Sequence, residues 1–167
     1  MPDVTGVVLE QLRAKDAQLF SLSDAFDVKA SIALVVITFL ATQSAAFLEK
    51  GSLLGRFEWV QRGSAVALAA AGALAVVALW PRVHQTETAE GLRAWAQQLR
   101  EYYKDQPNPE MAVTEAFHAG LVERLEERIA VNSRIDQSKS RYVDWSFKCT
   151  AAALALNMAT LLAFALA

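Results

Sequence analysis

The sequence predicts an all-α integral membrane protein with three transmembrane helices and a cytoplasmic helical hairpin between the second and third. The first supporting observation is that residues 30–48, 63–81 and 149–167, each 19 residues long, contain no Asp, Glu, Lys or Arg. A helix of that length reaches about 28 Å, close to the ~30 Å hydrocarbon core of a bilayer. The second is that these runs are apolar or small all round, whereas a soluble helix has a charged face opposite its apolar stripe.

Composition supports the same class. Hydrophobic residues make up 54% of the 167 residues, above the ~45–50% of soluble domains. The alternative, three buried helices of a soluble bundle, is disfavoured because too little polar sequence remains to cover them. The net charge of −2 implies no general nucleic-acid partner, and the single cysteine, Cys149, excludes an intramolecular disulfide. No cleavable signal peptide is predicted, so the first span would act as the insertion signal.

Residues 1–29 predict an amphipathic N-terminal helix that lies on the membrane, packs on the soluble part, or continues into the first span. Ser23 or Asp24 is a candidate cap for the helix that enters the span at residues 30–48. Since Gly6 is the only Gly or Pro between Pro2 and Gly51, a continuous helix is also possible.

A polar stripe follows one side of the first span. Ser31, Thr38 and Thr42 lie in line with Asp24 and Asp27 when residues are placed at 100° intervals. Lipid offers hydroxyl groups no partner, so the stripe is expected to face protein or a water-filled path. Helix packing and pore lining both remain open as interpretations.

Residues 49–62 predict a short extracytoplasmic loop, with Trp59 at the membrane interface. The second span, residues 63–81, is rich in alanine, and small residues let helix backbones approach closely in lipid. We therefore expect this helix to lie at the crowded centre of the bundle.

Residues 82–148 carry most of the charge and predict the cytoplasmic helical hairpin. The first helix is expected at residues 86–104, with a break at residues 106–109. The second helix is expected to begin at Pro109 or Glu110 and to run without interruption into the third span, forming a rod of more than 50 residues.

The third span, residues 149–167, contains Thr150, Asn157 and Thr160. Asn157 lies near its middle, and an amide in hydrocarbon needs a partner. We expect it to face another helix, with the Thr38 side of the first span as the candidate. A hydrogen bond between helices would be enough to explain an asparagine at this position.

The basic residues set the predicted orientation. Most Lys and Arg near the spans lie on the side of the N-terminus and the hairpin. Because cytoplasmic loops carry an excess of Lys and Arg, both are predicted to be cytoplasmic, in a multi-pass membrane protein.

The sequence offers little for catalysis. His84, His118 and Cys149 share no ligand spacing, so no metal site is expected. There is no Gly-rich phosphate loop and no nucleophile elbow. We predict that the protein is not an enzyme and needs no cofactor.

Two polar clusters flank the membrane. Asp27 and Lys29 precede the first span. The residues of the second cluster, before the third span, are Asn132, Ser133, Asp136, Lys139 and Arg141. With both clusters cytoplasmic, Asp27 is predicted to pair with Lys139 or Arg141. The cluster would serve either as a junction that positions the spans or as a switch joint that reorients them.

Two stretches resemble a known family. Residues 24–31, which open an apolar helix, and residues 129–139, which lead into the last span, resemble the two hallmark motifs of the Pycsar membrane effectors, a family related in layout to SLATT membrane effectors. The residues that match the motifs are Asp27, Lys29, Ser133 and Lys139.

The resemblance implies a bacterial antiviral effector. A partner cyclase would supply cyclic CMP or cyclic UMP during phage infection, and the effector would assemble or open in the membrane and impair its integrity. If the nucleotide binds directly, the basic face around Arg134, Lys139 and Arg141 is the candidate site.

A homo-oligomer is expected because three thin helices enclose no path alone. The competing hypothesis is an oligomeric scaffold or accessory subunit that docks a partner through the hairpin. A third hypothesis, an enzyme acting on lipids, needs a catalytic group in the spans and ranks last, because the spans offer only Asn157 and hydroxyl groups.

Overall fold

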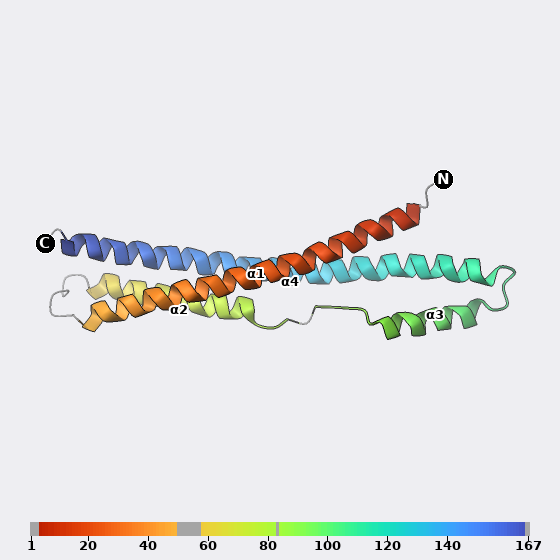
Figure 1. The fold of residues 1–167 in the computed structure, drawn as a ribbon, viewed down its shortest axis with the longest axis horizontal. Helices are drawn as coiled ribbons and strands as arrows, with labels where there is room; N and C mark the ends of the chain where they lie inside the picture. The colour runs from red at the N-terminus through yellow and green to blue at the C-terminus, as the bar shows by residue number, and fades with distance from the viewer. Residues whose placement is uncertain (1–3, 50–57, 83, 166–167) are drawn as a thin grey trace. The chain divides into compact units, whose positions relative to one another are not determined.

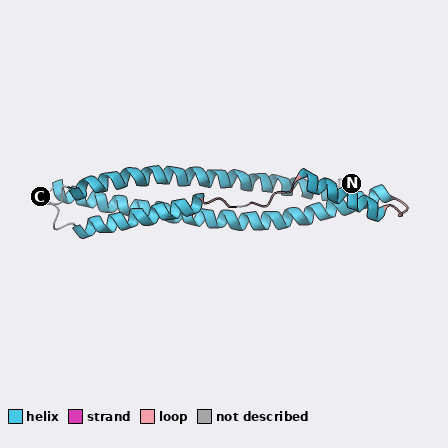
Figure 2. Cartoon of the chain, turned by 90° about the horizontal axis from the view of Figure 1, so that it is seen from below, coloured by secondary structure: helices cyan, strands magenta, loops and turns pink. Residues whose placement is uncertain are grey.

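The computed structural model describes residues 4–49, 58–82 and 84–165. Every regular element in these ranges is an α-helix (Figure 2). In chain order they are α1 (Val4–Glu49), α2 (Glu58–Leu79), α3 (Ala89–Tyr103) and α4 (Pro109–Ala165), coloured from red to blue in Figure 1. The predicted all-α class is confirmed.

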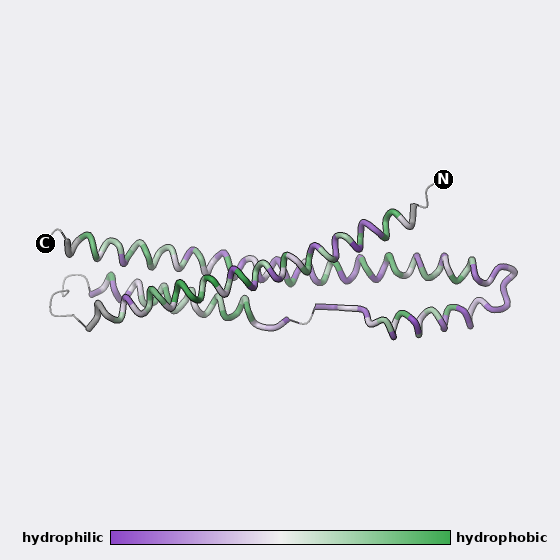
Figure 3. Tube along the Cα trace, in the orientation of Figure 1, coloured by the Kyte–Doolittle hydropathy of each residue, from purple (hydrophilic) through white to green (hydrophobic). Residues whose placement is uncertain are grey.

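The chain divides into two compact units. One contains Met1–Leu22 and Arg82–Asp136, and we call it the charged unit. The other contains Ser23–Pro81 and Gln137–Ala167, and we call it the apolar unit. The hydropathy colouring of Figure 3 follows this division, with purple recurring along α3 and green dominating α2. The helices α1 and α4 each contribute to both units.

The two long helices run without a break. α1 has 46 residues and α4 has 57, which confirms the predicted rod of more than 50 residues. The N-terminal segment continues directly into the first predicted span. Neither Ser23 nor Asp24 caps a helix, which corrects that prediction, because both lie in mid-helix where backbone N–H groups already bond within the helix.

α2 begins at Glu58, five residues before the predicted start of the second span. Its first turn is stabilised by an ion pair between Glu58 and Arg62, whose oxygen and nitrogen are 2.6 Å apart, and by the favourable position of an acidic residue there. Trp59 therefore lies on α2, with 73% of its surface exposed. Residues 50–57 of the predicted loop lie outside the described residues.

α3 and α4 begin close to the predicted positions. Thr88 caps α3, because its Oγ1 accepts a hydrogen bond from the backbone N–H of Gly91 at 3.1 Å. A short turn follows Tyr103, and α4 starts at Pro109, where a missing N–H costs nothing.

Large side chains fill the core of the charged unit, where α3 packs on α4. The rings of Trp95 and Phe117 lie 4.7 Å apart, centroid to centroid. The Trp95 ring also lies against Gly120, where an added Cβ would be only 2.5 Å from two ring atoms. Only glycine permits this approach. The buried leucines of the core are Leu9, Leu121 and Leu125.

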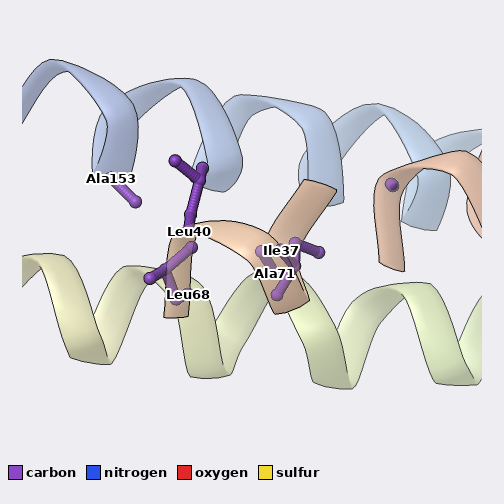
Figure 4. Close-up of a cluster of buried hydrophobic side chains, with 6 residues drawn as sticks. Ile37, Leu40, Leu68, Ala71 and Ala153 are labelled. Carbon is purple, nitrogen blue, oxygen red and sulfur yellow. The ribbon is translucent and has the colours of Figure 1, made fainter. Parts of the chain in front are cut away.

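Alanines pack together with larger aliphatic side chains in the core of the apolar unit, where α1, α2 and α4 meet (Figure 4). Ile37 and Leu40 of α1 pack on Leu68 and Ala71 of α2 and on Ala153 of α4. The buried residues of α2 follow one face of the helix: Val60, Gln61, Ser64, Leu68, Ala71, Ala75 and Ala78. The expectation that α2 lies at the crowded centre of the bundle applies to this face alone within one chain, because Ala65, Ala69, Ala70 and Ala73 are exposed.

Among the described residues, two helices are long and apolar enough to cross a membrane, namely Gly6–Ala45 of α1 and the whole of α2. Only 22% and 28% of their most apolar windows are buried, unlike the core helix of a soluble protein. Bulky apolar side chains such as Val35, 70% exposed, and Val66, 69% exposed, cover the outside. The third predicted span, at the end of α4, is not among the two and stays a prediction.

Candidate functional site

Lys139 is the most buried charged side chain that the sequence predicted as a site residue. It is 4% exposed, on α4 in the apolar unit. Its Nζ lies 2.9 and 3.1 Å from the two carboxylate oxygens of Asp27 and donates to Ser23 Oγ at 3.2 Å. A buried cation is tolerated when it is paired and hydrogen-bonded, and Lys139 meets both conditions.

The predicted pairing of Asp27 with Lys139 is thus confirmed. Arg141, the other candidate partner, is exposed. Lys29 is exposed as well, and its Nζ lies 5.9 Å from the centroid of the Phe26 ring. Of Lys29, Lys139 and Arg141, Lys139 alone is buried in the contact between α1 and α4.

Asn157 ties the three helices of the apolar unit together. Its amide nitrogen donates to Ser44 Oγ on α1 at 3.1 Å, and its amide oxygen accepts from Ser64 Oγ on α2 at 3.1 Å. Asn157 was predicted to face another helix, which is confirmed, but its partner on α1 is Ser44 and not Thr38. Deeper along α2, the carbonyl of Ala71 accepts from Ser146 Oγ at 2.9 Å.

The hydroxyl stripe of α1 lies outside these contacts. Ser31, Thr38 and Thr42 are exposed, and each donates to the carbonyl oxygen four residues earlier at 2.8 to 2.9 Å. Thr150 and Thr160 of α4 are buried and bond their own helix in the same way. Hydroxyl groups satisfied within a helix need no second helix, so the stripe does not hold this unit together.

In the charged unit, Asn132 holds the segment that follows α2. Its side chain is 1% exposed. Its amide oxygen accepts from the backbone N–H of Gln85 at 3.1 Å, and its amide nitrogen donates to the backbone carbonyl of Gln85 at 3.3 Å. One amide side chain therefore satisfies both backbone groups of one residue, as a neighbouring strand would.

Two further contacts join the same segment to α4. His84 Nε2 lies 3.4 Å from Asp136 Oδ1, and Arg82 donates to the carbonyl oxygen of Ile135 at 3.5 Å. The His84 ring lies 5.8 Å from the ring of Phe20 on α1, centroid to centroid. We call the contacts of residues 82–85 with residues 132–136 the connector clasp.

A buried ion pair joins α1 to α4 in the charged unit. Arg128 Nη2 lies 2.6 Å from Asp16 Oδ2, with both side chains at most 16% exposed. Arg128 also borders a groove of about 600 Å³, together with Arg124 and residues 84–87. Arg124 pairs with Glu87 at 3.7 Å, so the carboxylates of this unit neutralise both arginines of the groove.

These contacts position helices. No group of three or more metal-ligating side chains occurs in the part of the chain that the structure describes. In the basic face considered for a nucleotide, Lys139 is paired with Asp27, while Arg134 and Arg141 are exposed. The site is a set of buried polar contacts between helices.

Comparison with known proteins decides the family. The model of the Pycsar effector protein domain, PycTM, matches residues 11–167. The chain belongs to this family. No curated protein and no solved structure matches. As a Pycsar effector it acts in anti-phage defence, and its two span-length apolar helices indicate a membrane protein.

The stretch that carries the second motif of this Pycsar effector, residues 129–139, has one buried face on α4. Ile129, Asn132, Asp136 and Lys139 are all buried, at intervals of three and four residues. Of the two residues in this stretch that match the motif, Lys139 lies on this face and Ser133 is exposed. The buried contact at Lys139 therefore explains one of the two motif residues.

Sequence reasoning missed several residues of the effector's polar contacts. They are Asp16, Ser44, Ser64, His84, Gln85, Arg128 and Ser146. Ser64 carried a signal, because it is the lone hydroxyl in the apolar run at residues 63–81, whereas Ser44 shares its run with the more conspicuous hydroxyl stripe. Gln85 carried none, since it contributes its backbone.

Proposed function

We propose that this Pycsar effector spans the bacterial inner membrane three times and impairs its integrity when activated. The spans are residues 30–48, α2, and residues 149–167 of α4, with the charged unit in the cytoplasm. One observation carries the proposal: the family match covers an all-α chain in which two span-length helices expose bulky apolar side chains.

Tryptophans support the placement of α2. Trp59 and Trp80 stand at the two ends of the helix, 73% and 67% exposed. They are 21 residues apart in the sequence, which corresponds to about 31 Å of helix, the thickness of the hydrocarbon core. Tryptophan favours the membrane interface, so this spacing fits one complete crossing.

The packing of the apolar unit supports assembly. Ala30, Ala71 and Ala153 are 0% exposed, so the helices of the apolar unit pack closely where these residues meet. A path formed between several copies would need polar lining, and the exposed hydroxyl stripe of Ser31, Thr38 and Thr42 provides it. The trigger is a cyclic nucleotide, cyclic CMP or cyclic UMP, made by a partner cyclase.

The test is uptake of a membrane-impermeant dye by cells that express the effector with its cognate cyclase. We expect dye influx and arrested growth only when both proteins are active. The control is a catalytically dead cyclase expressed with the same effector. Cells that keep their membrane potential, although the effector is present in the membrane fraction, would refute the proposal.

The competing function is an oligomeric scaffold that docks a partner on the charged unit. The exposed side chains of Tyr102, 79% exposed, and Met111, 59% exposed, favour this reading. A pull-down that recovers one stoichiometric partner, with unchanged permeability, would support it over membrane disruption.

A further inference from the structure

An ion pair stands on the outside of α4 in the apolar unit. Lys148 Nζ lies 2.6 Å from Asp144 Oδ2, and the two side chains are 58% and 59% exposed. The same Nζ lies 4.9 Å from the centroid of the Trp145 ring, which is itself 57% exposed. These groups lie on the side of α4 opposite the buried Ser146 and Ala153.

Contacts with α1 fix the level of this ion pair. Asn157 bonds Ser44, and Val143 packs on Ala30, so residues of the two helices that are 113 apart in sequence lie at the same level. Lys148 is therefore level with residue 35 of α1. That residue lies six positions beyond the last basic residue before the first span, or about 9 Å farther along the helix.

Residue 35 belongs to the first proposed span, residues 30–48, and Val35 is an exposed, bulky apolar side chain. The register with α1 therefore places Lys148 at the level of the hydrocarbon, although Lys148 precedes the third proposed span by one residue. Charged residues at such depth are costly and normally face protein or a water-filled cavity. Asp144 and Lys148 neutralise each other, yet both side chains are more than half exposed in this chain. The surface therefore needs a partner that supplies polar groups.

The residues that continue this face of α4 favour packing against another helix. Asp144, Lys148, Ala151 and Ala155 follow one another at intervals of four, three and four residues, the spacing of a coiled-coil seam. Ala151 and Ala155 are exposed, and small residues at this spacing let two helices pack closely in lipid. The bulkier Leu154 lies to one side of the seam.

We propose that this face packs on α4 of a second copy of the chain, in parallel, with Asp144 of one copy paired with Lys148 of the other. The partner is another copy because the face carries both charges and is thus complementary to itself. The helices run in parallel because all copies insert with the same orientation. The inference rests on the proposed function for its membrane placement and assigns the contact between subunits.

Charge reversal tests the pairing between copies. Asp144→Lys alone gives each copy two cations on the seam, and Lys148→Asp alone gives each copy two anions there. We expect each single variant to lose self-association several-fold in detergent, and the two variants co-expressed with different tags to co-purify at the wild-type level. Mixed copies that associate no better than each variant alone would overturn the proposal.

Cross-linking tests the seam independently of charge. In a Cys149→Ser background, Ala155→Cys is expected to form a disulfide-linked dimer in membranes under mild oxidation. Leu154→Cys, at the same depth on another side of α4, serves as the control and is expected to remain monomeric. Equal cross-linking at both positions, or none at Ala155→Cys, would refute the seam.

The outcomes separate this inference from the proposed function. Cross-linking at Ala155→Cys without dye influx leaves the interface standing and refutes membrane disruption. Dye influx without cross-linking at Ala155→Cys refutes the interface and leaves membrane disruption standing. If Lys148 contacts a lipid phosphate instead, Lys148→Asp alone would weaken membrane retention and co-expression would restore nothing, which also overturns the proposal.

Discussion

The two units of this effector share α1 and α4 but pack them differently. In the charged unit, the helices are held by leucines, by the stacked rings of Trp95 and Phe117, and by ion pairs such as Arg128 with Asp16. In the apolar unit, alanines with no exposed surface bring the helices together, and serines and one asparagine bond across them.

Under the proposed membrane placement, the difference follows from the surroundings of each unit. In water, burial of large apolar side chains drives packing. In lipid, that driving force is absent between helices, so close contact through small residues and hydrogen bonds takes its place. The uninterrupted helix α4 would then follow both rules along its length. The following predictions test whether the units differ as this comparison requires.

The largest effect is expected at the ion pair of the apolar unit. Asp27→Ala should lower the free energy of unfolding by about 2–3 kcal/mol, because Lys139 is left buried without its counter-charge. This loss is smaller than for a fully buried pair, because the side chain of Asp27 is 43% exposed. Thermal unfolding in detergent measures it. Asp24→Ala, at an exposed position, is the control.

A double substitution sharpens this prediction. Asp27→Leu combined with Lys139→Met should cost less stability than Asp27→Ala alone, since no unpaired charge remains. Simple additivity in the double-mutant cycle would show that the two residues do not act as a pair.

The glycines provide the most direct comparison of the two units. Gly120→Ala in the charged unit should destabilise it by about 1–3 kcal/mol, because the new methyl group overlaps the Trp95 ring. Gly72→Ala in the apolar unit meets only an ordinary contact, 3.8 Å from Ile37, and should be neutral or stabilise by up to about 1 kcal/mol. Equal losses in both variants would contradict the described packing.

The connector clasp should depend on one amide. Asn132→Ala removes both hydrogen bonds to the backbone of Gln85 and should cost about 1–2 kcal/mol. Hydrogen exchange at the Gln85 amide should accelerate in this variant. Ser133→Ala, at the exposed neighbouring position, should leave that exchange rate unchanged; acceleration in both would assign the protection to α4 as a whole.

The corresponding amide of the apolar unit, Asn157, should contribute less to stability than Asn132. Asn157→Leu should cost about 0.6–1.5 kcal/mol, because hydrogen bonds between membrane helices contribute modestly. We also expect weaker assembly or toxicity. Met158→Leu, at an exposed position, is the control. Wild-type stability, oligomer size and toxicity in Asn157→Leu would rule out a role for the amide.

The smallest change in stability is expected in the hydroxyl stripe. Thr38→Val with Thr42→Val should shift the free energy of unfolding by less than about 0.5 kcal/mol, because both residues are exposed and bond only their own helix. Dye influx should nevertheless fall if the stripe lines a water path. Unchanged influx would exclude that role for Thr38 and Thr42.

Much of the fold could be predicted from the sequence. Uncharged runs and the scarcity of Gly and Pro predicted the helices, and Pro109 predicted the start of α4. The pair of Asp27 with Lys139 followed from opposite charges next to two spans. The early start of α2 was missed, because an apolar stretch with Trp59 resembles an interfacial loop until its ion pair at Glu58 is seen.

The sequence left open which face of the first span packs on the other helices, for a physical reason. A helical wheel shows which residues share a face but not which face packs. The conspicuous line of Ser31, Thr38 and Thr42 satisfies its hydroxyl groups internally, while the contact face contains Ala30, Ile37 and the single hydroxyl of Ser44. The connector clasp involves backbone atoms, which no side-chain pattern reveals.

Cysteine accessibility tests most directly whether lipid surrounds the apolar unit. In a Cys149→Ser background, Val35→Cys and Tyr102→Cys occupy highly exposed positions of the apolar and charged units, at 70% and 79%. In inverted membrane vesicles, a water-soluble maleimide should label Tyr102→Cys quickly and leave Val35→Cys unlabelled until detergent is added. Equally fast labelling of both in intact vesicles would contradict the account.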